Sequence, residues 1–139
     1  MPIDYQINKP VSADQFIDLL QRSTLAERRP VDDRACIEGM VSNSPLLISA
    51  WDGDKLVGVA RSLTDFVYAC YLSDLAVDRD YQKRGIGVQL QILTQAQLGD
   101  KCSLILLAAP AAQGYYGRIG FTAHPRAWIL ARNERLMVS

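Results

Sequence analysis

A glycine-containing motif in the middle of the chain has the residue types and spacing of an anion-binding turn. It reads Gln82-Lys83-Arg84-Gly85-Ile86-Gly87, between the extended apolar run 72–77 and a helical pattern over 88–98. A strand that turns through glycines into a helix gathers unpaired backbone N–H groups at the positive end of the helix dipole. Glycine also permits a positive φ and lets ligand oxygens come close to the backbone. Together with the charges of Lys83 and Arg84, this motif predicts a site for a phosphorylated cofactor.

The spacing of the glycines excludes two common nucleotide-binding motifs. The sequence lacks the Lys-Ser/Thr pair of a Walker motif, and a dinucleotide-binding motif would need a glycine where Leu90 stands. The pattern Gln82-x-x-Gly85-x-Gly87 follows a strand that ends in Leu75-Ala76-Val77. In this arrangement it resembles the coenzyme A loop of the GNAT (GCN5-related) N-acetyltransferases. Residues 82–88 are called the glycine loop below.

A second motif downstream supports the same resemblance. The apolar run 104–109 is followed by Ala112-Gln113-Gly114-Tyr115-Tyr116-Gly117-Arg118-Ile119-Gly120-Phe121. This segment is similar to the Ala-x-x-aromatic-Tyr-x-x-x-Gly-Phe sequence that follows the fifth strand of the family. An asparagine that often precedes it is Ala109 in this chain, so one side-chain hydrogen bond to the cofactor is expected to be missing or replaced. The resemblance covers residues 46–131 directly and residues 1–45 by the order of their elements.

The resemblance implies acetyl-CoA as cosubstrate, no metal, and direct attack by an amine without a covalent enzyme intermediate. Main-chain groups at the end of the fourth strand would pair with the pantetheine arm, and the glycine loop would hold the diphosphate. The implied cofactor-binding residues are Leu75, Ala76, Val77, Gln82, Lys83, Arg84, Gly85, Ile86, Gly87 and Val88.

Two side chains are candidates for proton transfer. Tyr116 matches the family tyrosine, and a phenol with a pKa of about 10 stays protonated at neutral pH and can protonate a thiolate. Its alternative role is aromatic packing. Asp74 is the candidate base, through a water, although strict alternation puts it on the opposite face from Tyr71 and Leu75. Asp65 through a water, His124, or an amine that arrives neutral are the other possibilities.

The order of elements predicts a mixed α/β fold. Strands are expected over 3–7, 46–51, 55–63, 66–77 and 103–109, with two last strands over 121–130 around Pro125. Helices are expected after Ser12, from Asp32 or Asp33 to Met40, over 88–98 and over 110–119. By resemblance this is the GNAT acyl-CoA N-acyltransferase fold: a mostly antiparallel mixed sheet with splayed parallel strands 4 and 5, flanked by about four helices.

Length and composition favour one domain, residues 1–139. The chain has 15 basic and 15 acidic residues, so its zero net charge argues against a general binder of nucleic acid or membranes. Cys36, Cys70 and Cys102 follow no metal or redox pattern and are expected to be reduced and buried. The N-terminus lacks the pattern of a signal peptide, so a cytoplasmic location is expected.

The function expected from these features is acetyl transfer from acetyl-CoA to a primary amine of a small molecule or peptide. By resemblance, acceptor choice would involve the first two helices, the charged loop 27–34 between them and the last strands. This loop is either simply solvated, or it frames a polar amine, with Asp32 or Asp33 pairing an ammonium or Arg28 or Arg29 a carboxylate. The main alternative is a catalytically silent acyl-CoA-binding or sensing module on the same fold, and a third is an unrelated nucleotide-phosphate binder. A homodimer through the C-terminal strands, common in the family, is possible.

Overall fold

The computed structural model describes residues 2–138, which divide after Leu107 into two compact units. The first unit contains all the strands and the three longer helices. The second unit begins at Ala108 and contains one short helix.

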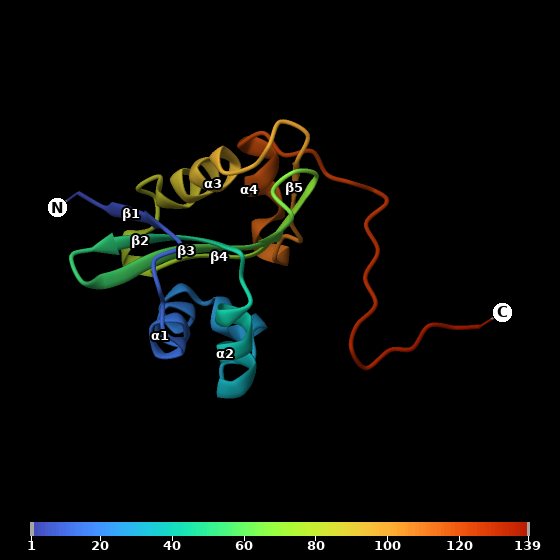
Figure 1. Ribbon diagram of the computed structural model, residues 1–139, viewed down its shortest axis with the longest axis horizontal. Coiled ribbons are helices and arrows are strands. Elements are labelled where there is room, and N and C mark those ends of the chain that lie inside the picture. Colours follow the sequence, from blue (N-terminus) through green and yellow to red (C-terminus); the bar gives the residue numbers. More distant parts are fainter. Residues whose placement is uncertain (1, 139) are drawn as a thin grey trace. The chain divides into compact units, whose positions relative to one another are not determined.

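The first unit is built on a five-stranded sheet with the order β1-β2-β3-β4-β5 (Figure 1). The first four strands pair antiparallel, and β5 runs parallel to β4, which confirms the expected meander and the expected parallel pair. The turn between β2 and β3 contains Gly53 at φ +60°. The strands are β1 (Asp4–Ile7), β2 (Leu46–Asp52), β3 (Lys55–Thr64), β4 (Ala69–Val77) and β5 (Ser103–Ile105).

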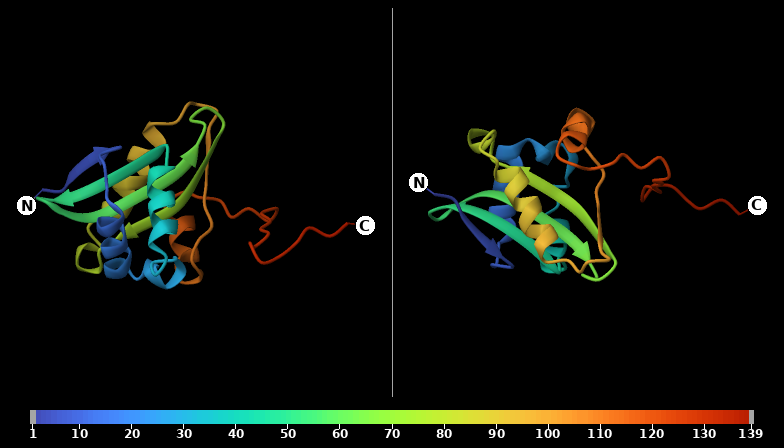
Figure 2. Two further views of the ribbon diagram at one scale, coloured as in Figure 1. Left: turned by 60° about the horizontal axis from the view of Figure 1, so that its bottom comes forward. Right: turned by 90° about the horizontal axis from the view of Figure 1, so that it is seen from above.

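Helices cover both faces of this sheet. Figures 1 and 2 show α1 (Ala13–Ser23) and α2 (Arg34–Ser42) on one face and α3 (Ile86–Ala96) on the other. Two short 3-10 turns, η1 (Leu25–Arg28) and η2 (Arg79–Tyr81), follow α1 and β4. This structure agrees with the predicted fold class: strands and helices alternate irregularly along the chain, β4 and β5 are parallel, and helices cover both faces of the sheet.

The two helical layers enclose two separate hydrophobic clusters. Phe16, Leu19 and Leu20 of α1 pack with Val59 and Ala76 of the sheet on the first face. On the second face, α3 packs Ile86 and Leu90 against β2, β3 and β4. Both layers therefore hold β4 in place by apolar burial, which is the main favourable term in folding.

Close approach of α3 to the sheet depends on Gly58 in β3. A Cβ built there would lie 3.1 Å from Leu90, 3.2 Å from Ile86 and 3.3 Å from Ala50, which all belong to the buried core. A side chain at this position would push on α3, whose first turn belongs to the glycine loop. Gly58 thus fixes the distance at which α3 can pack.

A β-bulge interrupts β4 and corrects the alternation expected for this strand. Arg61 of β3 pairs with Asp74, but the next residue of β3 pairs with Leu72, so Ser73 is an extra residue. Leu63 pairs with Tyr71, and Arg61 and Leu63 share a face of β3. Tyr71 and Asp74 therefore share a face of β4, and the prediction that they lie on opposite faces is wrong, because an inserted residue reverses the alternation.

The second unit contains the 3-10 turn η3 (Pro110–Ala112) and the helix α4 (Gln113–Arg118), as expected over 110–119. The expected strands over 121–130 are not formed: the described residues beyond α4 have no strand assignment. A strand needs a ladder of hydrogen bonds to a partner, and the local sequence does not provide one.

Two further observations concern the cysteines and the membrane. Cys70 is buried as expected, Cys102 is half-buried and Cys36 is exposed, so the expectation of burial is wrong for Cys36. Cys36 lies on the outer side of α2, where only Ile37 is fully buried. Among residues 2–138, no helix has the length and apolar character needed to span a bilayer.

Candidate active site

The edge of β4 that faces β5 is unpaired over most of its length. Pairing between the two strands covers only Ala69 to Tyr71, whereas β4 continues to Val77. Within the described chain, residues 72–77 thus have β3 on one side and no strand on the other. The backbone groups of Leu75, Ala76 and Val77, three of the predicted cofactor residues, belong to this free edge. Such an edge can accept an extended ligand as an additional strand.

The chain leaves β4 through Asp78, whose carboxylate is buried and fully engaged. The backbone N–H of Asp78 donates to Val57 of β3 at 2.8 Å, and its carboxylate accepts from the N–H of Asp80 at 2.8 Å. Arg22 of α1 donates to the same carboxylate, and the Lys55 ammonium lies 3.7 Å away. Burial raises the pKa of Asp78, but these hydrogen bonds and charges outweigh it, so the pKa lies below its usual value. The start of the turn is therefore firmly anchored.

The turn itself presents exposed side chains and left-handed backbone. Gln82 donates to the carbonyl of Val77 at 3.3 Å, which ties the turn to the end of β4. Lys83 has φ +65°, and Lys83 and Arg84 are both exposed. The guanidinium of Arg84 lies 4.9 Å from the ring centre of Tyr81, whose hydroxyl donates to Asp52 at 2.5 Å. The positive charges therefore surround the turn and stay accessible.

The first turn of α3 has no side-chain cap. Gly85 is the N-cap residue, with φ +77° and open space where a side chain would begin. The first helical bond runs from Gln89 N–H to Gly85 C=O at 3.0 Å, which leaves the N–H groups of Ile86, Gly87 and Val88 without a helical acceptor. By contrast, α1 and α2 are capped by Ser12 and Asp33. The glycine loop therefore has the unpaired donors that an anion would need.

Asp74, the predicted base, lies in a buried ion-pair network. Its side chain is fully buried, and each of its two oxygens accepts from a guanidinium, one from Arg29 and one from Arg61. Both carboxylate oxygens are thus already engaged by arginines of the protein itself. This environment is that of a structural carboxylate, and the catalytic role of Asp74 stays a prediction.

The other candidates for proton transfer have different surroundings. The carboxylate of Asp65 accepts three backbone N–H groups, from Val67, Tyr68 and Ala69, at 2.8 to 3.1 Å, and these bonds lower its pKa. It therefore holds the β3–β4 turn together. His124 is exposed, and its Nδ1 accepts from the N–H of Arg126 at 3.1 Å. Neither geometry assigns a base.

Tyr116 lies in the second unit, on α4. Its ring packs edge to face on Tyr115 and Phe121, with ring centres 5.1 and 5.5 Å away. Burial, followed by the neighbouring Tyr115, raises its pKa above 10.0. The phenol therefore stays protonated at neutral pH, as an acid must before it gives up its proton. The packing expected as its alternative role is present as well.

Arg29 and Arg61 are site residues that the sequence interpretation did not identify as partners of Asp74. Arginine is expected at the surface unless it is paired. Arg61 directly follows the apolar stretch 56–60 of β3, and Asp74 lies in the next strand of the meander. The signal that could have indicated this ion pair is a basic residue, Arg61, and an acidic residue, Asp74, within two neighbouring strands of largely apolar sequence.

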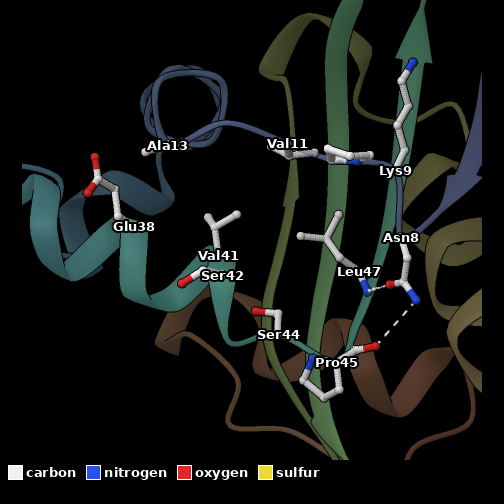
Figure 3. A pocket seen from close by; sticks show the side chains of 11 residues that line it. Asn8, Lys9, Val11, Ala13, Glu38, Val41, Ser42, Ser44, Pro45 and Leu47 are labelled. Carbon is white, nitrogen blue, oxygen red and sulfur yellow. Dashed lines mark hydrogen bonds between the residues drawn. The ribbon is translucent and has the colours of Figure 1, made fainter.

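A cavity of about 560 Å³ lies elsewhere in the first unit, and no predicted site residue lines it. It is an open hollow between the β1–α1 connection, α2 and the start of β2 (Figure 3). Val11, Val41 and Leu47 form its apolar part, and Asn8 accepts from the N–H of Leu47 at 2.8 Å at its edge. Asn8 is thus occupied by the backbone. Separately, residues 2–138 contain no group of three or more metal-ligating side chains.

Comparisons with known proteins agree with this architecture. An uncharacterised ycf52-like N-acetyltransferase from Prochlorococcus marinus is 28% identical over 121 residues, which cover 79% of this chain and 66% of that protein. A probable acetyltransferase from meticillin-resistant Staphylococcus aureus superposes with a TM-score of 0.74 at 18% identity, over 94% of this chain and 98% of that one. The structure of AAC(6')-Iy in complex with a CoA-containing bisubstrate analogue gives a TM-score of 0.71 at 18% identity, over 95% of this chain and 99% of that one.

The two structural likenesses show the fold, and the family follows from the sequence itself. Residues 21–129 match the model of the acetyltransferase (GNAT) domain. This match covers most of the chain and includes both the glycine loop and Tyr116. The protein therefore belongs to the GNAT acetyltransferase family.

Proposed function

We propose that this chain is an acetyl-CoA-dependent N-acetyltransferase that acetylates a primary amine of a small molecule or peptide. The observation that carries the proposal is the uncapped first turn of α3 directly after an unpaired β4 edge. Family membership supports the same reaction class. Since the match runs across the division after Leu107, we also propose that both units form one GNAT domain.

The residues present fit the chemical groups of acetyl-CoA. Free N–H groups of residues 86–88, with the exposed charges of Lys83 and Arg84, suit a diphosphate. The positive φ of Gly85, with open space around its Cα, leaves the backbone accessible to phosphate oxygens. The backbone of residues 75–77 would pair with the amides of the pantetheine arm. AAC(6')-Iy was solved with a CoA-containing analogue, which supports CoA as the ligand of this fold.

Acetyl-CoA, as cosubstrate, supplies an activated acetyl thioester. The neutral amine nitrogen attacks the carbonyl carbon and forms the new C–N bond, the C–S bond breaks, and the sulfur leaves as a thiolate. In this proposal Tyr116 donates its phenolic proton to the thiolate, the excess proton on nitrogen goes to water, and the Tyr116 phenolate regains a proton from water. A donor from the β4 backbone would stabilise the oxyanion. Holding both reactants in one complex makes the attack effectively intramolecular.

The described residues of the site provide no clear general base to deprotonate the amine. Both oxygens of Asp74 are taken by arginines, so a water relay through Asp74 would have to compete with two cations. We therefore favour an acceptor that enters as the neutral amine, with its proton lost to bulk water. The reaction rate should then rise with pH until the acceptor itself is deprotonated.

The experiment that tests the proposal measures release of free CoA thiol over a panel of amines, with acetyl-CoA binding measured separately by calorimetry. Tyr116→Phe should lower kcat by about 10- to 100-fold, because the thiolate then leaves without a positioned acid. Its acetyl-CoA dissociation constant should stay unchanged. Tyr115→Phe, one residue away, is the matched control and should keep full activity.

The outcomes separate the two hypotheses from the sequence. Acetyl-CoA binding without thiol release on any amine would instead establish the silent binding module. Full activity of Tyr116→Phe would exclude Tyr116 as the acid while leaving the reaction class intact. The homodimer and the cytoplasmic location stay predictions.

A further inference from the structure

Arg29 connects the segment between α1 and α2 to the middle of β4. It follows η1 directly, and its side chain is 22% exposed. Its Nε donates to one oxygen of Asp74, and its Nη2 donates to the backbone carbonyl of Ser73 at 2.7 Å. One planar guanidinium therefore binds a carboxylate and an adjacent carbonyl at the same time. A lysine could not reproduce this fork.

A second guanidinium holds the same two residues from β3. Arg61 donates through Nε to the other oxygen of Asp74 and through Nη2 to the hydroxyl of Ser73 at 3.1 Å. Its Nη1 reaches Ser44 at 3.2 Å and the carbonyl of Met40 at 3.4 Å, at the end of α2. The side chain of Arg61 is almost fully buried. Asp74 thus keeps one cationic partner even when Arg29 is removed.

The position of this network on β4 gives it a consequence for the site. Ser73 is the extra residue of the bulge, and the free edge proposed to meet the thioester begins beside it. A bulge sets the local bend and twist of its strand, and a shift of one residue would reverse which groups face each side. The hydrogen bonds from Arg29 and Arg61 to Ser73 and Asp74 keep the extra residue of the bulge at position 73.

We propose that Arg29 is a positioning residue for acetyl transfer, which fixes the direction of the β4 edge by gripping the bulge at Ser73 and Asp74. This inference rests on the proposed function. It also assigns the role of Arg29 differently from the sequence interpretation, in which Arg28 or Arg29 could pair with a carboxylate of the acceptor. In the structure the guanidinium of Arg29 is already used by the protein itself.

The anchor of the glycine loop is separate from this grip. Asp78 is held by Arg22, Lys55 and the backbone of β3, and none of these bonds involves Arg29. Loss of Arg29 should therefore leave diphosphate binding intact and change only the position of the acetyl thioester at the β4 edge. A displacement of the reacting groups by even a fraction of a bond length lowers the rate of an intramolecular reaction strongly.

The test compares Arg29→Ala and Arg29→Lys with Arg34→Ala, an exposed arginine of α2 that pairs with Asp14 and Glu38 at the surface. Arg29→Ala should lower kcat about tenfold or more, with the KM and dissociation constant of acetyl-CoA changed less than about twofold. Arg29→Lys should stay close to Arg29→Ala. Millimolar guanidinium should restore part of the kcat of Arg29→Ala, because the side chain borders solvent. Arg34→Ala should match the wild type.

Hydrogen exchange of the same proteins provides a readout that is independent of turnover. Arg29→Ala should speed exchange in residues 72–77 and leave the protection that acetyl-CoA gives to residues 82–90 unchanged. Unaltered exchange in 72–77, wild-type kcat in Arg29→Ala, or an equal loss of acetyl-CoA binding would each overturn the inference. If the wild type itself releases no thiol, the proposed function fails, and the exchange in 72–77 still decides whether Arg29 holds the bulge.

Discussion

Arg22 in the last turn of α1 pairs with Asp78 at the end of β4, 56 residues further along the chain. The same guanidinium donates to the carbonyl of Leu56 at 2.8 Å and to Asp18 at 2.9 Å. One side chain thus joins α1, β3 and the first residue of the turn that leads to α3. Burial raises the pKa of Asp78, but the N–H of Asp80 and the guanidinium of Arg22 together hold it below its usual value.

Asp78→Asn should destabilise the fold by about 2 kcal/mol at neutral pH, because Arg22 and Lys55 lose a buried anionic partner. The pKa of Asp78 is lowered in the folded state, so its contribution is present above the unfolded pKa of about 4 and is lost as the pH falls through the lower folded value. The difference in unfolding free energy between wild type and variant should therefore shrink below about pH 4.

Urea unfolding at several pH values measures this difference. Asp80→Asn is the control, since the Asp80 side chain is exposed and only its backbone N–H bonds to Asp78. A gap between Asp78→Asn and wild type that stays constant down to low pH would show that the charge of Asp78 is not what matters.

Gly85→Glu should abolish acetyl-CoA binding while the protein stays folded. A carboxylate at the N-cap of α3 would occupy the position proposed for the diphosphate and would repel it. Gly85→Gln is the matched control: it carries nearly the same volume and the same cost of a positive φ, without the charge. Calorimetric titration should show a larger loss of affinity for Gly85→Glu, by about 10-fold or more. Unchanged affinity in Gly85→Glu would remove the assignment of the glycine loop.

Gly58→Ala and Gly39→Ala should change stability in opposite directions. At Gly58 the added methyl meets three buried side chains at 3.1 to 3.3 Å, so overpacking should cost about 1–3 kcal/mol and displace α3. At Gly39, inside α2, no atom lies within 4 Å of the new Cβ, and alanine should stabilise the helix by about 0.5–1 kcal/mol. Thermal unfolding of both variants tests the pair, and a stable Gly58→Ala would mean that α3 can move away freely.

The fold and the glycine loop could be predicted because local signals specify them. Gly85 and Gly87 between an apolar strand and a helix leave few backbone solutions, and the turn at Gly53 joins two apolar runs. Even so, α3 begins at Ile86 rather than at residue 88. The reason is that Gly85 itself is the N-cap, in a conformation that glycine adopts without cost.

The buried network could not be predicted in the same way. Alternation around Ser73 is unbroken in the sequence, because a bulge is set by pairing with β3 and not by local composition. Arg29 lies in a charged stretch that is typical of a solvated loop, and only the tertiary structure brings it to Asp74. The missing strands over 121–130 have a similar cause, since an apolar run such as 127–131 forms a strand only where a partner strand can pair with it.

Arg22 and Arg29 flank η1, and they pair with Asp78, just after β4, and with Asp74, within β4. The length of the segment between these two arginines therefore has to match the distance between Asp74 and Asp78. An insertion or deletion within this segment would detach one end. Residues 30–33 lie outside both attachments, but Val31 packs against the hydrophobic cluster of α1 and Asp33 caps α2, so Pro30 and Asp32 are the positions to vary. Efforts to broaden the range of accepted amines should therefore vary Pro30 and Asp32 and keep the native length of the segment between Arg22 and Arg29.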